Sequence, residues 1–523
     1  MVKSILKRLN KTVLGGAILI SVFSVLSKIL GLVRDRMLAA SFGAGQVLDC
    51  YFAAFRIPDF IFNSLILGSL ASAFVPVFVK LSKEDEKYAI KVSNSVLNIV
   101  TIILSVLCFI AFLNVDFLVK ILAPGFDFFQ LQLTSRLTSI MLISVVFFGF
   151  SSVMSSILNA KKTYITYSIA PVFYNIGLII GIILSKYFGY DMLAWGVVLG
   201  SGLHFLVQLV EVLKLKWKYE FVFHLKDKNV LRIFKLMIPR TFGLVVNQIN
   251  QVVITMIASS LVAGSISVFY FGLNLQSFVV SIFGVSIAVA IFPVLSEFVG
   301  NDNHEDFKIY LEKNLRKITF FVLPISMFMI LTKFEIVKII LGAGNFNLQN
   351  VNYTANILGI FCISLIFQCI SAIVARAFYA YENTKTPVII AIISLVINII
   401  FCFALSKIMG IMGIALGFSI SNILNCLLLL ITISIKYKVF NVRSFLSYFL
   451  KIFFNCVIIF ILIYGFRFFY IKYIGIESFI KLFTEFIILF IIVFVLYYFI
   501  SVFEKLEEVQ FIKVFFKKFI KIK

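Results

Sequence analysis

The sequence predicts an all-α protein that crosses a membrane many times. Its 523 residues are 62% hydrophobic and only 14% charged, and the mean hydropathy is +1.08. Soluble domains are closer to half apolar and a quarter charged, so this chain has too few polar residues to cover a water-soluble surface of its size. Two further observations support the prediction: long apolar runs recur along the chain, and the chain contains an internal repeat.

The apolar runs set the number of helices. A membrane-spanning helix needs roughly 20 apolar residues, and the sequence contains about fourteen runs of that length. Gly31 in the first run and Pro58 in the second are predicted sites of a kink. We predict spanning helices at residues 14–42, 46–80, 88–114, 131–159, 163–186, 191–213, 231–261, 265–297, 309–332, 351–381, 386–408, 411–435, 445–470 and 478–503.

The connections between these helices alternate in charge. One set is basic or densely charged, for example KLSKEDEKYAIK and AKKT, whereas the other set is short or poor in lysine, for example FGAGQ and SKIMG. Basic loops remain in the cytoplasm, so the net charge of +23 indicates topology rather than binding of nucleic acid. Because the number of predicted helices is even, both termini are predicted to be cytoplasmic.

Short segments recur about 220 residues apart. DFLVKILAPGF near residue 120 returns as FEIVKIILGAGNF near residue 338, and Asn175 followed by LSK returns as Asn398 followed by LSK. Repeated halves that rock around a central site are typical of alternating-access transporters. We predict a six-helix bundle over 1–220, an equivalent parallel bundle over 221–440, two extra helices over 441–503 and a basic amphipathic tail over 504–523.

Charged residues interrupt the first two apolar runs. The equivalent positions of the second half are uncharged and include Asn247 and Asn274, so the fold does not need charge there. We therefore expect the charges of the first half to serve a ligand. These residues are Lys28, Arg34, Asp35, Asp49, Arg56 and Asp59.

Their spacing predicts a polar cavity. Lys28 lies about 14 residues into the first helix, roughly 21 Å along its axis, which is deep in a hydrocarbon core about 30 Å thick. Asp35 shares the face of Lys28, and the three charges of the second helix share another face. Ionisable groups at such a depth normally face a cavity or pair with one another. Arginine suits bidentate binding of phosphate, so the predicted ligand is an anion, and a phosphorylated one fits well.

Other interpretations of these residues remain open. The charges can form structural ion pairs, and Arg34 and Arg36 can extend to the membrane interface. Arg36 and Asp49 suit such a structural role best. The seven cysteines form no CxxC pair and the three histidines are scattered, so we expect no metal site and no disulfide framework.

The start of the chain resembles a known family. SKILGLVRDRMLAASFGAGQVLDCYFAAFRIPDF and the following GSLASAFVPVF resemble the first helices of the MurJ (MviN) lipid II flippases, which belong to the MOP exporter superfamily. QINQVVITMIASSLVAGSISVFYF is similar to helix 7 and the start of helix 8 of that family. The resemblance implies a MOP/MATE-like fold and a flippase rather than an enzyme. Its substrate would be the undecaprenyl-pyrophosphate-linked peptidoglycan precursor, carried from the inner to the outer leaflet of the bacterial cytoplasmic membrane.

The resemblance also implies roles for the charged residues. Lys28 takes the place of the family's first cavity arginine, Arg34 matches the second, and Arg56 matches the basic residue before the proline, so these three are expected to bind the pyrophosphate. Asp35, Asp49 and Asp59 are expected to form ion pairs in the cavity or to act in gating. Asn247 and Asn274 are further candidate polar residues of the cavity. The last two helices are expected to form a groove for the lipid tail.

The chain also departs from the family. Paired arginines after the proline are replaced by Phe62 and Asn63, and a cavity arginine of helix 8 appears as Asn274. The cargo could therefore be another polyprenyl-linked oligosaccharide. A multidrug antiporter would favour acidic cavity residues, and a polyprenyl-phosphate glycosyltransferase would need a catalytic acid or base and usually a large loop outside the membrane.

The sequence also bears on energy and partners. It contains no GxxxxGK[ST] motif, so we expect no nucleotide cofactor, and membrane potential or an ion gradient is the expected energy source. The expected partners are the lipid-linked precursor, the bilayer and the cell-wall synthesis machinery.

Overall fold

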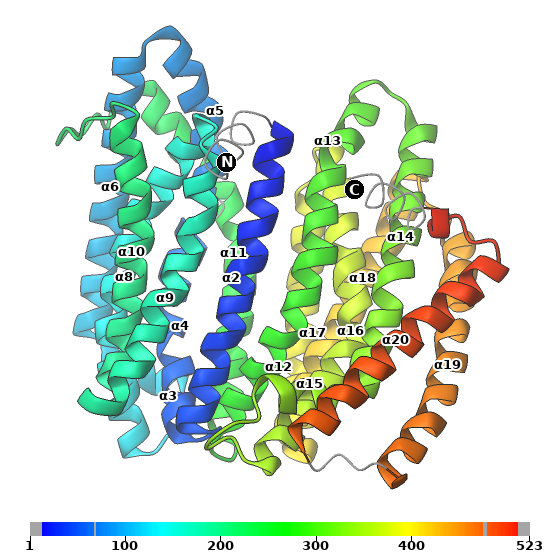
Figure 1. Ribbon diagram of the computed structural model, residues 1–523. Helices are drawn as coiled ribbons and strands as arrows, with labels where there is room; N and C mark the ends of the chain where they lie inside the picture. The colour runs from blue at the N-terminus through cyan, green and yellow to red at the C-terminus, as the bar shows by residue number, and fades with distance from the viewer. Residues whose placement is uncertain (1–12, 67–68, 474–477, 511–523) are drawn as a thin grey trace, which may run out of the picture. The chain divides into compact units, whose positions relative to one another are not determined.

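The computed structural model describes residues 13–66, 69–473 and 478–510, and over these residues it contains helices and no strand (Figure 1). Twelve helices in the described part of the chain are long and apolar enough to cross a membrane. Two further long helices, α2 (Val13–Phe42) and α11 (Lys228–Ser259), occupy the remaining two predicted positions. The predicted all-α polytopic architecture is therefore confirmed.

The chain divides into two compact units. The first contains residues 1–267 and 343–346, and the second contains residues 268–342 and 347–523. In addition to α2 and α11, the first unit contains α3 (Gln46–Ala54), α4 (Arg56–Leu65), α5 (Ser69–Glu84), α6 (Glu86–Leu113), α7 (Val115–Leu122), α8 (Phe128–Ala160), α9 (Tyr164–Phe188) and α10 (Asp191–Lys214).

The second unit contains the helices that follow. They are α12 (Ser265–Val279), whose first three residues belong to the first unit, the π-helix η1 (Val280–Val285), α13 (Ser286–Gly300), α14 (His304–Leu331), α15 (Lys333–Ile340), α16 (Leu348–Ala380), α17 (Lys385–Met409), α18 (Ile411–Tyr437), α19 (Val442–Tyr473) and α20 (Phe479–Phe503). Helix α20 ends before the predicted amphipathic tail, and residues 511–523 of that tail lie outside the described residues.

The internal repeat extends to helix lengths. The series α6, α7, α8 and α9 has 28, 8, 33 and 25 residues, and the series α14, α15, α16 and α17 has the same four lengths. The caps also match, because the Asp127 side chain accepts from the Gln130 N–H at 2.8 Å and the Asn347 side chain accepts from the Asn350 N–H at 2.9 Å. These side chains satisfy N–H groups that the first turn leaves unpaired.

The compact units and the predicted bundles have different boundaries. Helix α11 is the first helix of the repeated half, yet it packs against α4 and α5 and belongs to the first unit. The packing boundary therefore falls at Ser267 instead of residue 220. The predicted ranges 1–220, 221–440 and 441–503 describe repeats rather than packing, and they stay a prediction.

The second predicted helix is broken. We predicted one helix over 46–80, whereas the structure has α3, α4 and α5. Phe55 ends α3 and precedes α4. Pro58 has no N–H to donate to the carbonyl of Ala54, and its ring crowds that carbonyl, which explains the break between the two helices. Helix α2, in contrast, continues through Gly31.

Glycines bring α9 and α10 into close contact. A Cβ on Gly177 would lie 2.3 Å from the Cα of Gly200, and a Cβ on Gly181 would lie 2.5 Å from the Cα of Gly196. Small residues at this spacing let helix backbones approach in a membrane, where packing replaces the hydrophobic effect. The α9–α10 contact is therefore a closely packed part of the first unit.

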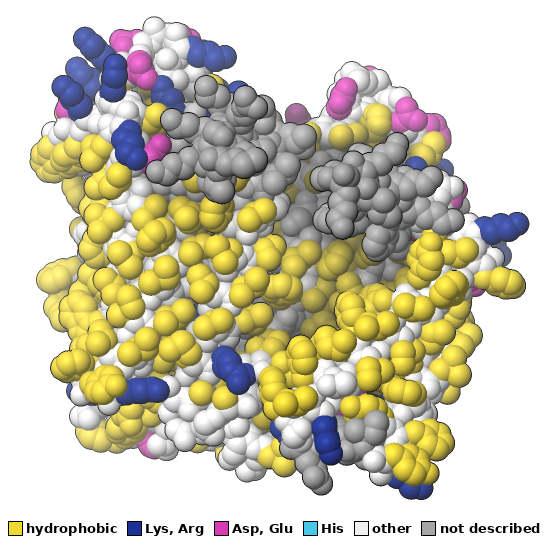
Figure 2. All heavy atoms as spheres, viewed as in Figure 1, with side chains coloured by type: hydrophobic (Ala, Val, Ile, Leu, Met, Phe, Trp, Pro, Cys, Tyr) yellow, Lys and Arg dark blue, Asp and Glu magenta, His cyan; other side chains and the backbone are white. Residues whose placement is uncertain are grey.

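The outer surface suits a lipid environment. In the view of Figure 2, hydrophobic side chains cover much of the visible face, and Lys, Arg, Asp and Glu of the first unit gather at the end that carries the α5–α6 connection. Phe109 and Leu113 of α6 and Ile400 and Phe403 of α17 are among the exposed apolar residues. Such a surface is expected of a multi-pass membrane protein.

Candidate functional site

Arg34 of α2 is held in one orientation by two neighbours. Its Nε and Nη2 atoms donate to the same Asp35 oxygen at 2.9 and 2.7 Å, and its Nη1 atom donates to the Asn175 side-chain oxygen at 3.4 Å. The Arg34 side chain is 20% exposed, whereas that of Asp35 is 4% exposed. These bonds use three of the five N–H donors of the guanidinium group.

Asn175 of α9 connects this arginine to the helix packing. Its side-chain nitrogen donates to the carbonyl and hydroxyl oxygens of Ser27 in α2 and to the carbonyl of Pro171 in α9. The amide therefore bridges the two helices and presents its oxygen to Arg34. In the second half, the equivalent Asn398 instead accepts from Cys402 of its own helix.

Further charged residues gather around this pair. Lys28 is exposed on α2 and interacts electrostatically with Arg34 and Asp35. Asp59 of α4 interacts with Arg56 in the same way. Tyr174 of α9 joins the two groups, because it lies within electrostatic range of both Arg34 and Asp59.

The structure thus brings five of the six charged candidates into one cluster. Three are cations and two are carboxylates, so the cluster has a net charge of +1 when all five are ionised. The Nε atom of Arg56 also donates to the carbonyl of Phe52 at 3.2 Å, which orients it at the start of α4. An excess of positive charge among membrane helices favours an anionic ligand. The members are Lys28, Arg34, Asp35, Arg56 and Asp59.

Asp49, the sixth candidate, lies elsewhere in the first unit. It is 2% exposed, and one of its oxygens accepts from the backbone N–H of Gly264 at 2.6 Å. Its other oxygen accepts from the N–H of Ser267 at 2.8 Å and from the Ser267 hydroxyl. These donors lie at the start of α12, where the helix dipole favours a negative charge. Asp49 thus holds a helix start, and a gating role for it stays a prediction.

The two asparagine candidates have different settings. Asn247 is exposed on α11 of the first unit, and Asn274 is partly buried in α12 of the second unit.

Phe62, which stands where the family has an arginine, contacts Phe148 with ring centroids 5.3 Å apart, and Phe148 contacts Tyr174 at 5.2 Å. Aromatic contacts therefore connect Phe62 to Tyr174, which lies beside the charged cluster.

Three residues that lie beside this cluster were not among the predicted site residues. Asn175 was noted only as a mark of the repeat, and neither Tyr51 nor Tyr174 was singled out. Tyr51 is buried and lies within electrostatic range of Arg34 and Asp35. Asn175 could have been found from the sequence, because an asparagine recurs in the equivalent apolar run of each half of the chain, at Asn175 and Asn398. The sequence does not show which helix Asn175 faces.

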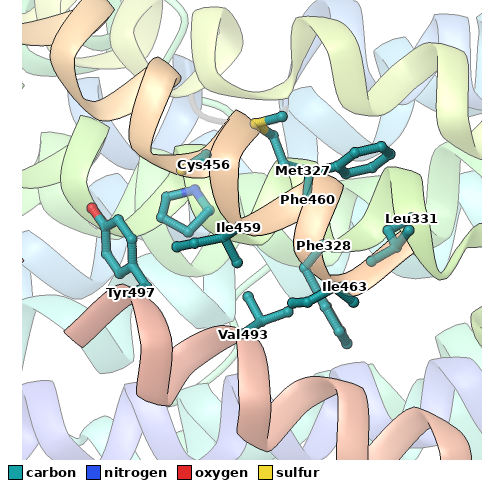
Figure 3. Close-up of a pocket in the computed structure, with 10 residues that line it drawn as sticks. Met327, Phe328, Leu331, Cys456, Ile459, Phe460, Ile463, Val493 and Tyr497 are labelled. Atoms are coloured by element: carbon teal, nitrogen blue, oxygen red, sulfur yellow. The ribbon is translucent and has the colours of Figure 1, made fainter. Parts of the chain in front are cut away.

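The second unit contains an apolar pocket. Side chains of α14, α19 and α20 line an apolar pocket of about 290 Å³, a volume that includes the open space at its mouth (Figure 3). Its walls include Phe328 and Leu331 of α14, Ile459 and Ile463 of α19, and Val493 of α20. Such a surface suits a hydrocarbon chain.

Known sequences agree over most of the chain. The family model described as "Lipid II flippase MurJ" matches residues 38–485. A probable lipid II flippase MurJ of Buchnera aphidicola subsp. Acyrthosiphon pisum is 31% identical over 422 residues, which cover 78% of this chain and 81% of that protein. A lipid II flippase MurJ of Burkholderia cenocepacia is 28% identical and covers 78% of this chain and 81% of that protein.

Solved structures agree as well. A lipid II flippase MurJ in an inward closed conformation has a TM-score of 0.79 and 28% sequence identity, and the match covers 93% of this chain and 99% of that one. An inward-facing multidrug transporter of the MATE family has a TM-score of 0.66 at 14% identity, covering 79% of this chain and 96% of that one. The second likeness shows a shared MOP fold.

Proposed function

The chain belongs to the MurJ family of lipid II flippases, and we propose that it moves lipid II across the membrane by binding the pyrophosphate at Arg34. The family resemblance predicted from the first helices is confirmed by matches along most of the chain. We propose which residues bind the lipid, in which direction it is transported and which energy source drives the transport.

The orientation of Arg34 is the observation that carries this proposal. Asp35 and Asn175 together fix the plane of the guanidinium group. A planar donor group held in place suits two oxygens of a phosphate, because less side-chain entropy is lost on binding. Asp35 also neutralises the arginine when no lipid is bound, which lowers the cost of a charge among apolar helices.

Lys28 and Arg56 supply the remaining positive charge. A pyrophosphate carries more negative charge than one arginine balances, and the two other cations of the cluster approach it from α2 and α4. Asp35 and Asp59 then act as counterions that keep the empty site close to neutral. We assign Asn247 and Asn274 to contacts with the sugars and the peptide, which offer hydrogen-bonding groups rather than charge.

The apolar pocket of the second unit is the proposed contact of the lipid tail. The pocket is lined by α14, α19 and α20, and the last two of these are the helices that follow the repeat. A polyprenyl chain gains little by leaving lipid for protein, so this pocket would orient the tail rather than supply most of the affinity.

We place the protein in the bacterial cytoplasmic membrane with both termini in the cytoplasm, on the grounds of the basic connections. Transport from the inner to the outer leaflet proceeds by alternating access of the two repeats, and no covalent bond of the lipid changes. The flipped lipid passes to the cell-wall synthesis machinery. Membrane potential or an ion gradient drives the cycle; in vesicles, a flipping rate indifferent to both would end this part of the proposal.

Binding measurements test the site directly. Purified protein in nanodiscs is titrated with lipid II, and undecaprenyl pyrophosphate without sugars serves as a competitor. We expect Arg34→Ala to weaken binding at least tenfold and to abolish competition by the pyrophosphate lipid. Arg136→Ala is the matched control, because Arg136 is 62% exposed and pairs with Asp191 outside the cluster. Equal affinities for the wild type and Arg34→Ala would contradict the assignment.

A further inference from the structure

A second group of buried charges lies in the second unit, next to Leu331, which also lines the apolar pocket. Arg467 of α19 lies between Glu335 of α15 and Glu485 of α20. Its Nη2 atom donates to Glu335, its Nη1 atom donates to the Leu331 carbonyl at 3.0 Å, and its Nε atom lies 3.4 Å from an oxygen of Glu485. Both glutamate side chains are 0% exposed, and the arginine side chain is 20% exposed.

The two glutamates are not equally bonded. One oxygen of Glu335 accepts a hydrogen bond from Arg467. Within the described structure, neither oxygen of Glu485 accepts a hydrogen bond, and the second oxygen of Glu335 accepts none either. An ionised carboxylate that is fully buried and lacks hydrogen bonds is costly. Glu485 is therefore the member of the group whose ionised form is least stabilised.

The charge balance gives the same result. One arginine and two ionised glutamates would leave a net charge of −1 inside the helix packing. The two carboxylates also interact electrostatically with each other. When two carboxyl groups share a site, the first ionises readily and the second resists ionisation. Binding of one proton makes the group neutral.

Within the described structure, the charged groups that act on Glu485 are Glu335 and Arg467. Helix α14 contributes the Leu331 carbonyl, and α19 contributes Arg467. On α15 the neighbouring cations have other contacts, since Lys333 donates to Asn356 at 2.7 Å and Lys338 lies over the Phe334 ring. On α20, Lys481 precedes Glu485 by one turn and is exposed.

We propose that Glu335 and Glu485 form a proton-binding pair that holds one proton at neutral pH. The proton resides on Glu485, because Glu335 takes the hydrogen bond from Arg467. The group joins α15 to α19 and α20, so loss of the proton adds a buried negative charge and weakens that contact. This site goes beyond the proposed pyrophosphate site, and its test needs no transport.

Infrared difference spectroscopy tests the proposal. Protein in nanodiscs is compared at neutral and alkaline pH, and the C=O stretch of a protonated carboxylic acid is followed. We expect a band that is present at neutral pH and lost at alkaline pH. Glu485→Gln removes this band. Glu335→Gln also removes it, because Arg467 then balances an ionised Glu485.

A variant that should increase the band distinguishes the proposal from misfolding. Arg467→Gln removes the cation, so both glutamates should be protonated and the band should grow, which an unfolded protein cannot mimic. Glu504→Gln on the same chain segment is the control that leaves the band unchanged, because Glu504 accepts from Asn455 and pairs with Lys451. A band that survives Glu485→Gln at full intensity, or that is absent from the wild type at neutral pH, would overturn the proposal.

Discussion

Arg34 illustrates what single residues contribute to this protein. The sequence placed Lys28, Arg34 and Asp35 deep in an apolar helix, and their spacing indicated a common purpose. The sequence did not identify Asn175, because its partner Ser27 lies in a helix about 150 residues away, and such a contact depends on packing. The same limit applies to Asp49, whose partners Gly264 and Ser267 follow more than 200 residues later.

The geometry of Arg34 predicts a difference between arginine and lysine at this position. Arg34→Lys keeps the charge but loses the planar group that Asp35 and Asn175 orient. A hydrogen bond to a charged group contributes about 1.5–3 kcal/mol, so we expect lipid II affinity to fall by about 10- to 100-fold. Titration of the variant in nanodiscs measures this. An affinity within twofold of the wild type would mean that charge alone is recognised.

At the scale of elements, helix number and order were predictable, whereas helix breaks were only partly so. A kink was predicted at Pro58, and the structure has a break between α3 and α4 nearby. The π-helix at 280–285 had no sequence signal that we recognised. The matched lengths of α6 to α9 and α14 to α17 show that the repeat preserves elements even where few residues are shared. Side-chain roles diverge more readily than helix lengths, since packing fixes the latter.

Gly344 predicts how strongly one loop is docked to α2. Its φ is +54°, and a Cβ would lie 2.4 Å from the Ala40 carbonyl oxygen, while the next residue, Asn345, donates its N–H to the same oxygen at 2.9 Å. Gly410 has φ +55° and open space around a Cβ. Gly410→Ala should therefore cost only the strain of its backbone conformation (φ +55°, ψ −132°), about 1–3 kcal/mol. Gly344→Ala should cost clearly more, because the loop must also move.

Thermal unfolding in detergent compares the two variants. We expect the melting temperature of Gly344→Ala to lie several degrees below that of Gly410→Ala. If both variants melt together, the contact between residues 343–346 and α2 does not contribute to stability as the structure suggests.

Asp227 predicts how the start of α11 responds to pH. Partial burial favours its neutral form, but hydrogen bonds from the Tyr88 hydroxyl at 2.6 Å and from the N–H groups of Asn229 and Val230 hold the pKa of Asp227 below its ordinary value. Its folded-state pKa is thus lower than its unfolded one, near 3.9. The stabilisation is therefore complete above that value and is lost as the pH falls through the folded-state pKa.

Unfolding as a function of pH measures this effect. Asp227→Asn should lower stability at neutral pH by about 1 kcal/mol, because hydrogen bonds to a charged acceptor are replaced by bonds to a neutral amide oxygen, and the difference from the wild type should vanish in acid. Asp116→Asn, at an exposed position in the first turn of α7, controls for loss of a charge. A difference that persists unchanged in acid would show that the cap acts through shape rather than charge.

At the scale of the whole molecule, the fold class was predictable from the sequence, whereas the division into compact units was not. Composition and the repeat were enough to predict an all-α transporter fold, because apolar length and helix count are properties of the sequence alone. The compact units were not predictable in the same way, since α11 packs with the first unit although the repeat assigns it to the second half. We propose that the charge difference between the halves connects fold to function, because the sequence positions of the second half that correspond to Lys28, Arg34 and Arg56 are uncharged.

The central claim is that Arg34 binds the pyrophosphate of lipid II during transport. Its most direct test is complementation of a bacterium depleted of its own lipid II flippase, with the wild type, Arg34→Ala and the control Arg136→Ala expressed at equal levels. The measured quantity is the fraction of lipid II accessible at the outer leaflet. The account predicts that the wild type and Arg136→Ala restore it and that Arg34→Ala does not. Restoration by Arg34→Ala would contradict the claim and would leave the charges of α2 with a structural role.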